Sequence, residues 1–451
     1  MTDTITETAL ADPLTRDTVA LTRELIRNAC VNDGSPDSGD EHRSVASLER
    51  FLHGSGARLE VVEPHPGRTS LVATVPGTEP DAPTLLLLGH LDVVPVGDGW
   101  SRDPFGADLA DGVVWGRGAL DMLHLTASYA GVLRRVARSP LRGTLILAAV
   151  ADEESGGRYG AEWIVANRPE LVRADGVLSE TGGIPLSVGG AVRGVTVTVG
   201  EKGITGRRLE VTGHPRHAST PYGADNAIVT AAGIVERLAG STEAPELDDL
   251  WPHYVAALDV SEELRAALVD PARIDGALSL LGPLAGLAHA LTRTTYSPDV
   301  IRGGDKLNVV PGRASIDVDI RTMSGVDGDD VDAHLRAAVG PAADRVRIRP
   351  LGGTTPATRS PLDTELYAAL AESVAVAHPG AEAVPVIAPG GADSRFFRRL
   401  GIPAYGFGMF SPRWDHATFR HLVHSDDERI DVASIHLAAL AIERVVQRVL
   451  G

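Results

Sequence analysis

Acidic and imidazole side chains follow several apolar segments that are typical of strands. In "LLLLGHLDVVP" a histidine and an aspartate are two residues apart, so both side chains leave the strand on one face. Further acidic groups stand in "GRGALDM", "VADEESGG" and "VLSETGG", each after an apolar run or before a helix. Groups at the carboxyl ends of strands in an open α/β sheet converge where such sheets bind ligands. The converging residues are His90, Asp92, Asp121, Glu153, Glu154 and Glu180.

Together these residues indicate a cation site, although each has an ordinary structural interpretation by itself. Asp121 could cap a helix, and a double glutamate is common in a solvated turn. Several carboxylates at one sheet edge, however, raise each other's pKa unless a cation neutralises them. Near the C-terminus, "RHLVHSDDERI" adds His421 and His424, whose spacing would place both on one side of a helix.

The elements that must position these groups alternate between strand-like and helix-like segments up to about residue 200. This alternation predicts an α/β protein with a mostly parallel sheet. Beyond it, polar-alternating strands such as "TGRRLEVTG" predict a smaller inserted α+β domain with one sheet face exposed. We expect a catalytic domain in two parts, residues 1–201 and 353–451. The inserted domain would span residues 202–352, with a helical elaboration at about 241–297.

Composition narrows the class of protein. The chain has 451 residues, 43% of them hydrophobic, and a net charge of −18 without any basic block, which argues against a nucleic-acid or anionic-membrane partner. A single cysteine, Cys30, rules out an internal disulfide and fits a reducing compartment. The N-terminus lacks the features of a secretory signal, so we expect a cytoplasmic protein. The apolar stretch Ala277–Ala290 is short and broken by Pro283, which favours a buried or interface helix over a membrane span.

Eight motifs occur along the chain in a fixed order: "GHLDVVP", "GRGALDM", "ADEESGG", "SETGG", "GHPRHASTP", "LNVVPGRASIDVDIR", "PGGADSRFFRRLGIPAYGFG" and "VHSDDERI". This ordered set, from about Leu85 to Ile430, resembles the di-zinc amidohydrolase and peptidase family. That family includes aminoacylases, carboxypeptidase S, glutamate carboxypeptidase and succinyl-diaminopimelate desuccinylase. The resemblance implies a parallel-sheet zinc-hydrolase catalytic domain and an inserted lid or dimerisation domain.

The resemblance also implies two divalent metal ions, with zinc expected and cobalt or manganese possible. His90 and Glu180 would bind the first ion and Glu154 and His424 the second, while Asp121 would bridge both. Each ion would then have three protein ligands and one position left for a bridging water, as in open catalytic zinc sites.

Other roles are carried over from the same family. Glu153 would be the general base that takes a proton from the water. Asp92 would hold His90 in its ligating tautomer. His217 in "RHASTP" resembles the histidine that stabilises the oxyanion in a neighbouring subunit's site. This implies a homodimer, or a domain closure that brings His217 near.

Substrate contacts are expected from the inserted domain and from a glycine loop. Asn308 and Arg321 resemble substrate-contacting residues, with Arg321 suited to a carboxylate. Gly390 and Gly391 in "PGGADSRFF" would expose backbone N–H groups to the substrate, although an ordinary strand-to-helix turn would look the same.

Hydrolysis of an amide or peptide bond beside a free carboxylate is the predicted reaction. A dipeptidase, a carboxypeptidase and an N-acyl-amino-acid deacylase all fit, and the alternative is a catalytically silent metal-binding or scaffold protein. Phosphoryl transfer lacks its phosphate-binding loop motif. Where relatives often carry Lys-Gly, this chain has Leu123 and His124. His124 could be a surface helix residue, an extra polar group near the metals or a feature of the substrate side, and we favour the first. The only lysines are Lys202 and Lys306, a pattern that reflects either a need for the compact cation or chance.

Overall fold

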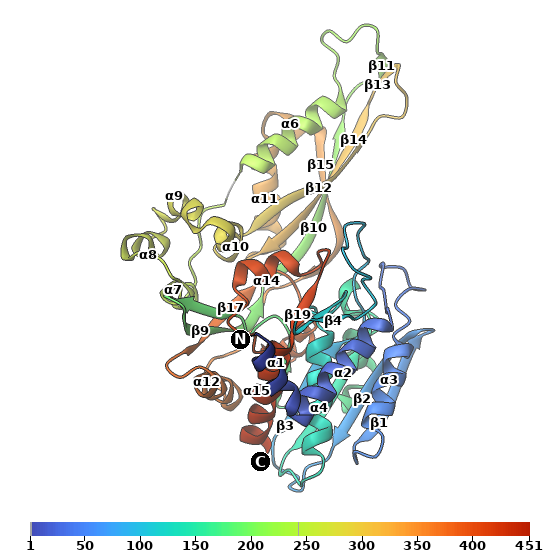
Figure 1. Ribbon diagram of the computed structural model, residues 1–451. Helices are drawn as coiled ribbons and strands as arrows, with labels where there is room; N and C mark the ends of the chain where they lie inside the picture. Colours follow the sequence, from blue (N-terminus) through green and yellow to red (C-terminus); the bar gives the residue numbers. More distant parts are fainter. Residues whose placement is uncertain (1, 242) are drawn as a thin grey trace.

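A large sheet, parallel at its centre, forms the body of the protein. The computed structural model describes residues 2–241 and 243–451 (Figure 1). Ten strands join in this sheet along the order β1-β2-β6-β3-β7-β18-β9-β16, with β8 and β17 paired to β9. The pairs β6–β3, β3–β7, β7–β18 and β17–β9 are parallel, and antiparallel pairs flank them. The strands are β1 (Arg58–His65), β2 (Arg68–Val75), β3 (Thr84–His90), β6 (Thr144–Val150), β7 (Gly176–Ser179), β8 (Pro185–Val188), β9 (Ala191–Glu201), β16 (Thr358–Arg359), β17 (Glu382–Ala388) and β18 (Ala404–Gly406).

Helices cover both faces of this sheet, which makes its central strands almost wholly apolar. Helices α2, α3, α4, α12 and α15 supply the larger core on one face, and α5 and α13 supply a smaller core on the other. The expected α/β class with a largely parallel sheet is confirmed. The helices here are α1 (Thr2–Ala11), α2 (Pro13–Arg27), α3 (His42–Leu52), α4 (Leu123–Val136), α5 (Ala161–Asn167), α12 (Glu365–Ala377), α13 (Ser394–Arg398), α14 (His416–Leu422) and α15 (Val432–Leu450), with the short turns η1 (Glu153–Ser155) and η2 (Pro169–Leu171).

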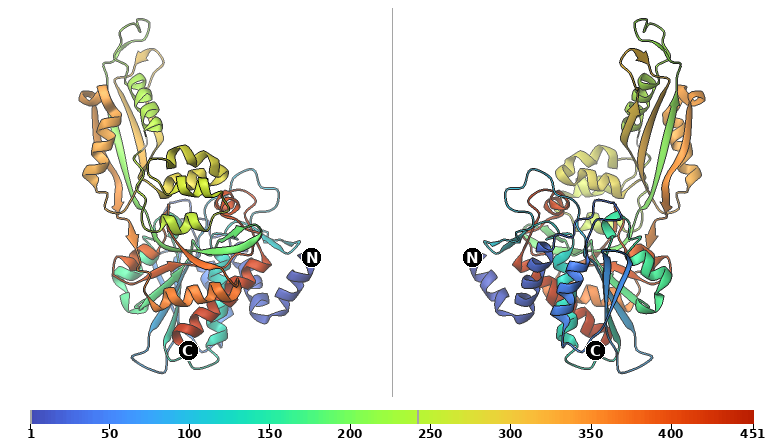
Figure 2. Two further views of the ribbon diagram at one scale, coloured as in Figure 1. Left: turned by 90° about the vertical axis from the view of Figure 1, so that its left-hand side faces the viewer. Right: turned by 90° about the vertical axis from the view of Figure 1, so that its right-hand side faces the viewer.

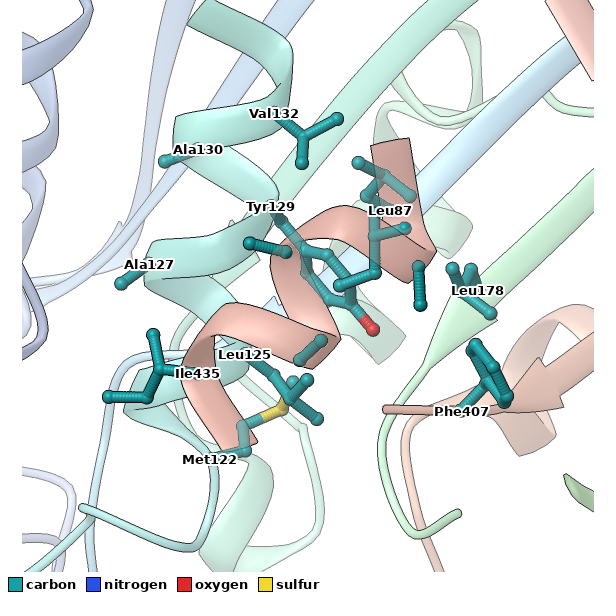
Figure 3. Packing of buried hydrophobic residues seen from close by; sticks show 14 of the residues in the cluster. Leu87, Met122, Leu125, Ala127, Tyr129, Ala130, Val132, Leu178, Phe407 and Ile435 are labelled. Atoms are coloured by element: carbon teal, nitrogen blue, oxygen red, sulfur yellow. The ribbon is translucent and has the colours of Figure 1, made fainter. Parts of the chain in front are cut away.

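Helix α4 ties the sheet to the residues that follow its strands. Figure 3 shows Tyr129 among apolar side chains of α4, α15 and the sheet. Its hydroxyl donates a hydrogen bond of 3.0 Å to the carbonyl oxygen of Ser179, the last residue of β7. Because Glu180 follows directly, the core fixes the backbone from which that carboxylate projects. A three-stranded sheet of β4 (Leu109–Ala110), β5 (Val113–Trp115) and β19 (Arg429–Asp431) lies beside the helices.

A second sheet forms an arm that extends away from the body (Figure 2). The chain enters it after β9 and returns at β16, and its strand order is β12-β14-β10-β15. Buried and half-buried residues alternate along β10, so one face of this sheet carries a core with α6 and α11. The arm consists of β10 (Gly203–Thr212), β12 (Thr295–Gly303), β14 (Arg313–Thr322), β15 (Val346–Thr355), α6 (Ala227–Gly240), α11 (Gly328–Val339), η4 (Gly340–Arg345) and, at its tip, the paired β11 (Arg216–His217) and β13 (Val309–Val310).

The helical elaboration within the inserted segment packs on the body. Its buried residues share one apolar cluster with β8 and β17 of the large sheet. Residues 274–291 have the length and hydropathy that a membrane span would need. The stretch nevertheless changes direction at Gly282, whose φ is 54°. The helices are α7 (Trp251–Ala256), α8 (Glu262–Leu268), α9 (Ile274–Ala277), η3 (Leu278–Leu284) and α10 (Ala285–Leu291).

Candidate metal centre and active site

Three neighbouring parallel strands end at the same edge of the large sheet and carry most of the predicted site. His90 is the last residue of β3 and pairs with Val150, the last of β6. The turn η1 after β6 presents Glu153 and Glu154, and Glu180 follows β7. Asp121 arrives from the loop before α4, and His424 from the loop after α14. The strand ends therefore bring these side chains together, as the sequence predicts.

Asp121 lies between the two histidines. Its Oδ1 is 3.2 Å from His90 Nε2, and its Oδ2 is 3.2 Å from His424 Nε2. His90 Nε2 is also 3.8 Å from Glu180 Oε2, and His424 Nε2 is 3.2 Å from Glu154 Oε2. One carboxylate thus lies between two separate sets of possible metal ligands, which is the arrangement needed to bridge two cations.

The donor atoms suit divalent metal ions. His90, Asp121 and Glu154 each offer a ligand atom within 4.8 Å of the others, and so do His90, Glu153 and Glu180. Glu154 Oε1 is buried and has no hydrogen-bond partner within the described residues. A buried, unpartnered carboxylate oxygen is costly unless a cation compensates it. The residues present therefore fit a metal pair.

The contact between Asp92 and His90 is made by the main chain of Asp92, whereas the prediction assigned it to the side chain. The Nδ1 atom of His90 lies 2.9 Å from the backbone oxygen of Asp92, whereas the Asp92 carboxylate is 3.7 Å away. The carboxylate instead accepts the backbone N–H groups of Glu153 and Glu154, each at 3.1 Å. The main chain at Asp92 thus orients the imidazole, and its side chain holds the turn that carries the two glutamates.

A buried polar network behind this turn uses partners, Arg68 and Asn32, that no local sequence pattern indicates. Asp152, with φ of 71°, pairs with Arg68, and its other oxygen accepts the Tyr159 N–H at 2.9 Å. Asn32 donates to Asp92 at 2.8 Å and to Asp152 at 3.2 Å. The turn is therefore fixed by residues that come from distant elements.

Glu428 is a further residue that sequence reasoning missed. It is fully buried, and its Oε1 accepts the backbone N–H groups of Leu120 and Asp121 at 2.7 and 3.0 Å. Arg117 neutralises its other oxygen at 2.6 Å. Glu428 thereby fixes the backbone at Asp121. The acidic "HSDDERI" segment was the available signal, but only the folded chain shows which of its carboxylates turns inward.

The charges of the site are strongly coupled. Burial opposes ionisation of His90, but the hydrogen bond to Asp121 and the charge of Glu180 hold its pKa well above the ordinary value. Hydrogen bonds to Asp121 and Glu154 raise the pKa of His424 to about 10. Burial raises the pKa of Glu153 and of Glu180 well above the usual range of a glutamate. The metal-free site therefore holds bound protons at neutral pH.

Metal uptake is accordingly expected to release protons. Imidazoles and carboxylates must be deprotonated to bind a metal. The raised pKa values of His90 and His424 favour their protonated forms, so metal binding must displace protons from these imidazoles. Metal affinity should therefore rise with pH up to the His424 pKa of about 10. Calorimetric titration of zinc in buffers of different ionisation enthalpy should show this release. His424→Ala should release fewer protons, and an enthalpy independent of buffer would contradict the expectation.

The site opens into a cavity of about 800 Å³. Acidic metal-site residues line one side of it, and Arg321, Arg395 and Arg420 bring positive charge. The predicted Gly390 and Gly391 also line it, in the loop between β17 and α13. The cavity thus places cations for an acidic group beside the candidate metal centre.

Two predicted residues lie far from this cavity within one chain. His217 belongs to β11 and Asn308 directly precedes β13, at the tip of the arm in Figure 1. Both are exposed, and His217 Nδ1 lies 2.7 Å from Ser219 Oγ. A single chain does not bring these two residues to the metal centre.

Two other histidine interpretations are wrong. His124 is 1% exposed, because α4 is buried between the sheet and other helices, and its ring lies 5.6 Å from that of Phe410. Burial also lowers the His124 pKa to about 4. His421 and His424 do not share one side of a helix, since α14 ends at Leu422 and His424 has φ of 62°. His421 is exposed.

Comparisons with known proteins identify the family. The sequence profile of Peptidase family M20/M25/M40 matches residues 86–448. The chain belongs to this family. The resemblance given by the ordered motifs is confirmed, and this M20 protein is a metal-dependent hydrolase.

Relatives and solved structures agree with this assignment. The chain is 29% identical over 395 residues to mouse (Mus musculus) aminoacylase-1, covering 86% of both proteins. It is 25% identical over 368 residues to succinyl-diaminopimelate desuccinylase of Wolinella succinogenes, covering 81% of this chain and 83% of the relative. An M20 family metallo-carboxypeptidase from Sulfolobus solfataricus shares the fold, with a TM-score of 0.71, 19% identity and coverage of 97% and 99%.

Proposed function

We propose that this M20 hydrolase cleaves an amide or peptide bond next to a free carboxylate, as a dipeptidase, a carboxypeptidase or an N-acyl-amino-acid deacylase. The observation that carries the proposal is the position of Asp121 between His90 and His424, on the wall of a cavity that also presents Arg321. The relatives named aminoacylase and desuccinylase support the class of bond.

Two divalent ions, zinc by preference and cobalt or manganese as alternatives, would be held by His90, Asp121 and Glu180 on one side and Asp121, Glu154 and His424 on the other. When bound, such ions polarise a carbonyl and lower the pKa of water. Oxygen and nitrogen ligands of this kind accept several divalent metals.

Glu153 is assigned the proton transfer. It lies within the cluster of His90 and Glu180 and lines the cavity, while its neighbour Glu154 contacts His424. Its carboxylate would take a proton from the attacking water and deliver it to the leaving nitrogen. A catalytically silent scaffold on this fold has no chemical need for such a group.

The substrate's carboxylate would be bound by Arg321 and by backbone N–H groups of the loop at Gly390 and Gly391. Arg321 is half-buried and donates to both oxygens of Asp319, from Nε at 2.7 Å and from Nη2 at 3.1 Å. This contact fixes the direction of its guanidinium, and Nη1 would be the nitrogen that meets the substrate. A planar, oriented guanidinium suits a carboxylate. A Cβ added at Gly391 would meet Ile204 Cδ1 at 2.9 Å, so glycine keeps this wall of the cavity open.

A homodimer would complete the site with His217 and Asn308 of the second copy. The arm offers a suitable surface, because β12 is an edge strand of its sheet and exposed apolar side chains lie on β12 and α6. An unpaired edge invites pairing with another chain. These side chains include Ile228, Val229 and Ile301, which are 39%, 67% and 52% exposed.

A substrate panel tests the proposal. Protein stripped of metal and reloaded with zinc, cobalt or manganese would be assayed with dipeptides, N-acyl amino acids and the same compounds with an amidated C-terminus. We expect hydrolysis of the free acids and a loss of kcat/KM of about 100-fold for the amidated compounds, because they cannot form the charge-assisted hydrogen bond from Arg321 to a substrate carboxylate. Absence of hydrolysis with every metal would overturn the proposal.

A further inference from the structure

The helical insert forms one wall of the active-site cavity. Leu287 and Leu291 of α10 line the same cavity as Asp121 and Glu153. Because the two leucines are four residues apart, they lie on one face of the helix. The next residue after Leu287, Ala288, is 1% exposed and packs into the core of the insert. Leu291 also packs against the edge of that core, so α10 is anchored by its own core while Leu287 and Leu291 reach the cavity.

Apolar side chains lie on other walls of the same cavity. Ile204 is the second residue of β10, where the arm begins, and Ile387 lies near the end of β17. Both are half-buried, as are Leu287 and Leu291. Half-buried apolar groups around one cavity leave hydrocarbon surface that a ligand can cover, and each covered methylene favours binding. The cavity of about 800 Å³ is within the size range of sites for small organic ligands, roughly 300–1,000 Å³.

A buried lysine fixes the position of α10. Lys202, 1% exposed, donates from Nζ to the carbonyl oxygen of Ala290 at 2.9 Å and to that of Arg293 at 2.6 Å. These carbonyls belong to the last turn of α10 and the residues just after it, where a cation also suits the helix dipole. The ammonium has a compact tetrahedral head that can donate to two carbonyls at once, whereas a guanidinium is planar.

Two further contacts join the insert to the body. The Tyr254 hydroxyl of α7 and Nδ1 of His416 on α14 are hydrogen-bonded at 3.0 Å. Trp251, Tyr254 and Ala288 share an apolar cluster with Val384 and Val386 of β17. The insert is thus docked on the catalytic body, although the sequence places it within the arm segment.

We propose that the insert makes an apolar specificity subsite, in which Leu287 and Leu291 contact a bulky aliphatic or aromatic group of the substrate. Lys202 is the positioning residue that holds α10 in place for this contact. The inference rests on the proposed amide hydrolysis and deepens it, since it assigns a substrate class to the same site: peptides or N-acyl amino acids with a large apolar side chain.

Matched substrates test the subsite. N-acetyl-leucine and N-acetyl-glycine, and Leu-Leu and Gly-Gly, differ in the apolar group at an unchanged scissile bond. The wild-type enzyme should prefer the leucine compound of at least one pair by 10-fold or more in kcat/KM. Leu287→Ala and Leu291→Ala should each lower kcat/KM for that compound about 10-fold, mainly through KM, and leave the glycine compound within about 2-fold. Leu280→Ala is the matched control, because Leu280 lies on the same insert, is 70% exposed and does not line the cavity.

Lys202→Met tests the positioning role. It should reproduce the selective loss for the leucine compound, with the same change in KM rather than in kcat. Equal losses on leucine and glycine compounds would show a merely structural lysine and overturn that role. If the wild-type enzyme hydrolyses both members of each pair equally well, or if the leucine variants keep full selectivity, the subsite itself is overturned. Failure to hydrolyse any of the four compounds would instead count against the proposed function.

Discussion

Replacing Glu153 with glutamine is expected to lower kcat by about 10²- to 10⁴-fold, the range for loss of a positioned general base. Metal content should stay near two ions per chain, because the five residues proposed as metal ligands are unchanged. Glutamine preserves the shape of the side chain and removes its ability to accept the proton. The measurement is steady-state kinetics together with metal analysis of the same preparation.

Glu154→Gln is the matched control for this change. Glu154 is adjacent in sequence, and its backbone N–H is held by the same Asp92 carboxylate. Its Oε2, however, lies 3.2 Å from His424 Nε2. Glu154→Gln should therefore lose about one metal ion per chain along with activity. If Glu153→Gln loses the metal and Glu154→Gln keeps it, the two roles are exchanged.

The sequence could predict the main donors because each stands beside a recognisable element. Parallel strands ending at one edge require His90, the Glu153–Glu154 pair and Glu180 to be close, whatever the details of packing. The charge argument then requires a cation. The division of labour between the two glutamates came from resemblance, and the contact of Glu154 with His424 is the geometric observation that now supports it.

The contacts that support the site could not be predicted, because the residues that make them are remote in sequence. Arg68 meets Asp152 across 84 positions, and Glu428 meets the Asp121 N–H across 307. No periodicity or fixed spacing in the sequence marks such pairs. Asp92 shows a related limit, since only the folded loop reveals that its main chain, rather than its carboxylate, lies nearest His90 Nδ1.

The misplaced histidines have simple physical causes. Helix α4 is covered on most sides, so it lacks the polar face that would mark an exposed position such as that expected for His124. The helix carrying His421 ends before His424, and helical spacing no longer applies beyond its end. The helical insert is a separate case. Its apolar stretch predicts that it is buried, but not which domain it packs against.

The position of His217 leads to a prediction that distinguishes an active site built by one chain from one shared between two chains. His217→Ala should lower kcat by about 10²- to 10³-fold, as removal of an oxyanion donor does, and should leave metal content unchanged because His217 is remote from the metal ligands of its own chain. His214→Ala is the matched control. It is exposed in the same segment and pairs with Asp225 at 2.8 Å, away from the cavity-lining residues, so its activity should remain close to that of the wild type.

Co-expression of His217→Ala with Glu153→Gln then tests assembly. In a mixed dimer with shared sites, the His217→Ala chain keeps its own Glu153 and receives an intact histidine from its partner, so one site is complete. If the two chains pair at random in a C2 dimer, about half of the dimers are mixed and each of these has one complete site. The preparation should then show about a quarter of wild-type activity, averaged over all sites. If His217 reached its own chain's cavity by closure of the arm, both sites of the mixed dimer would stay defective. The absence of recovery in a preparation shown to contain mixed dimers would therefore contradict cross-subunit catalysis and favour closure within one chain.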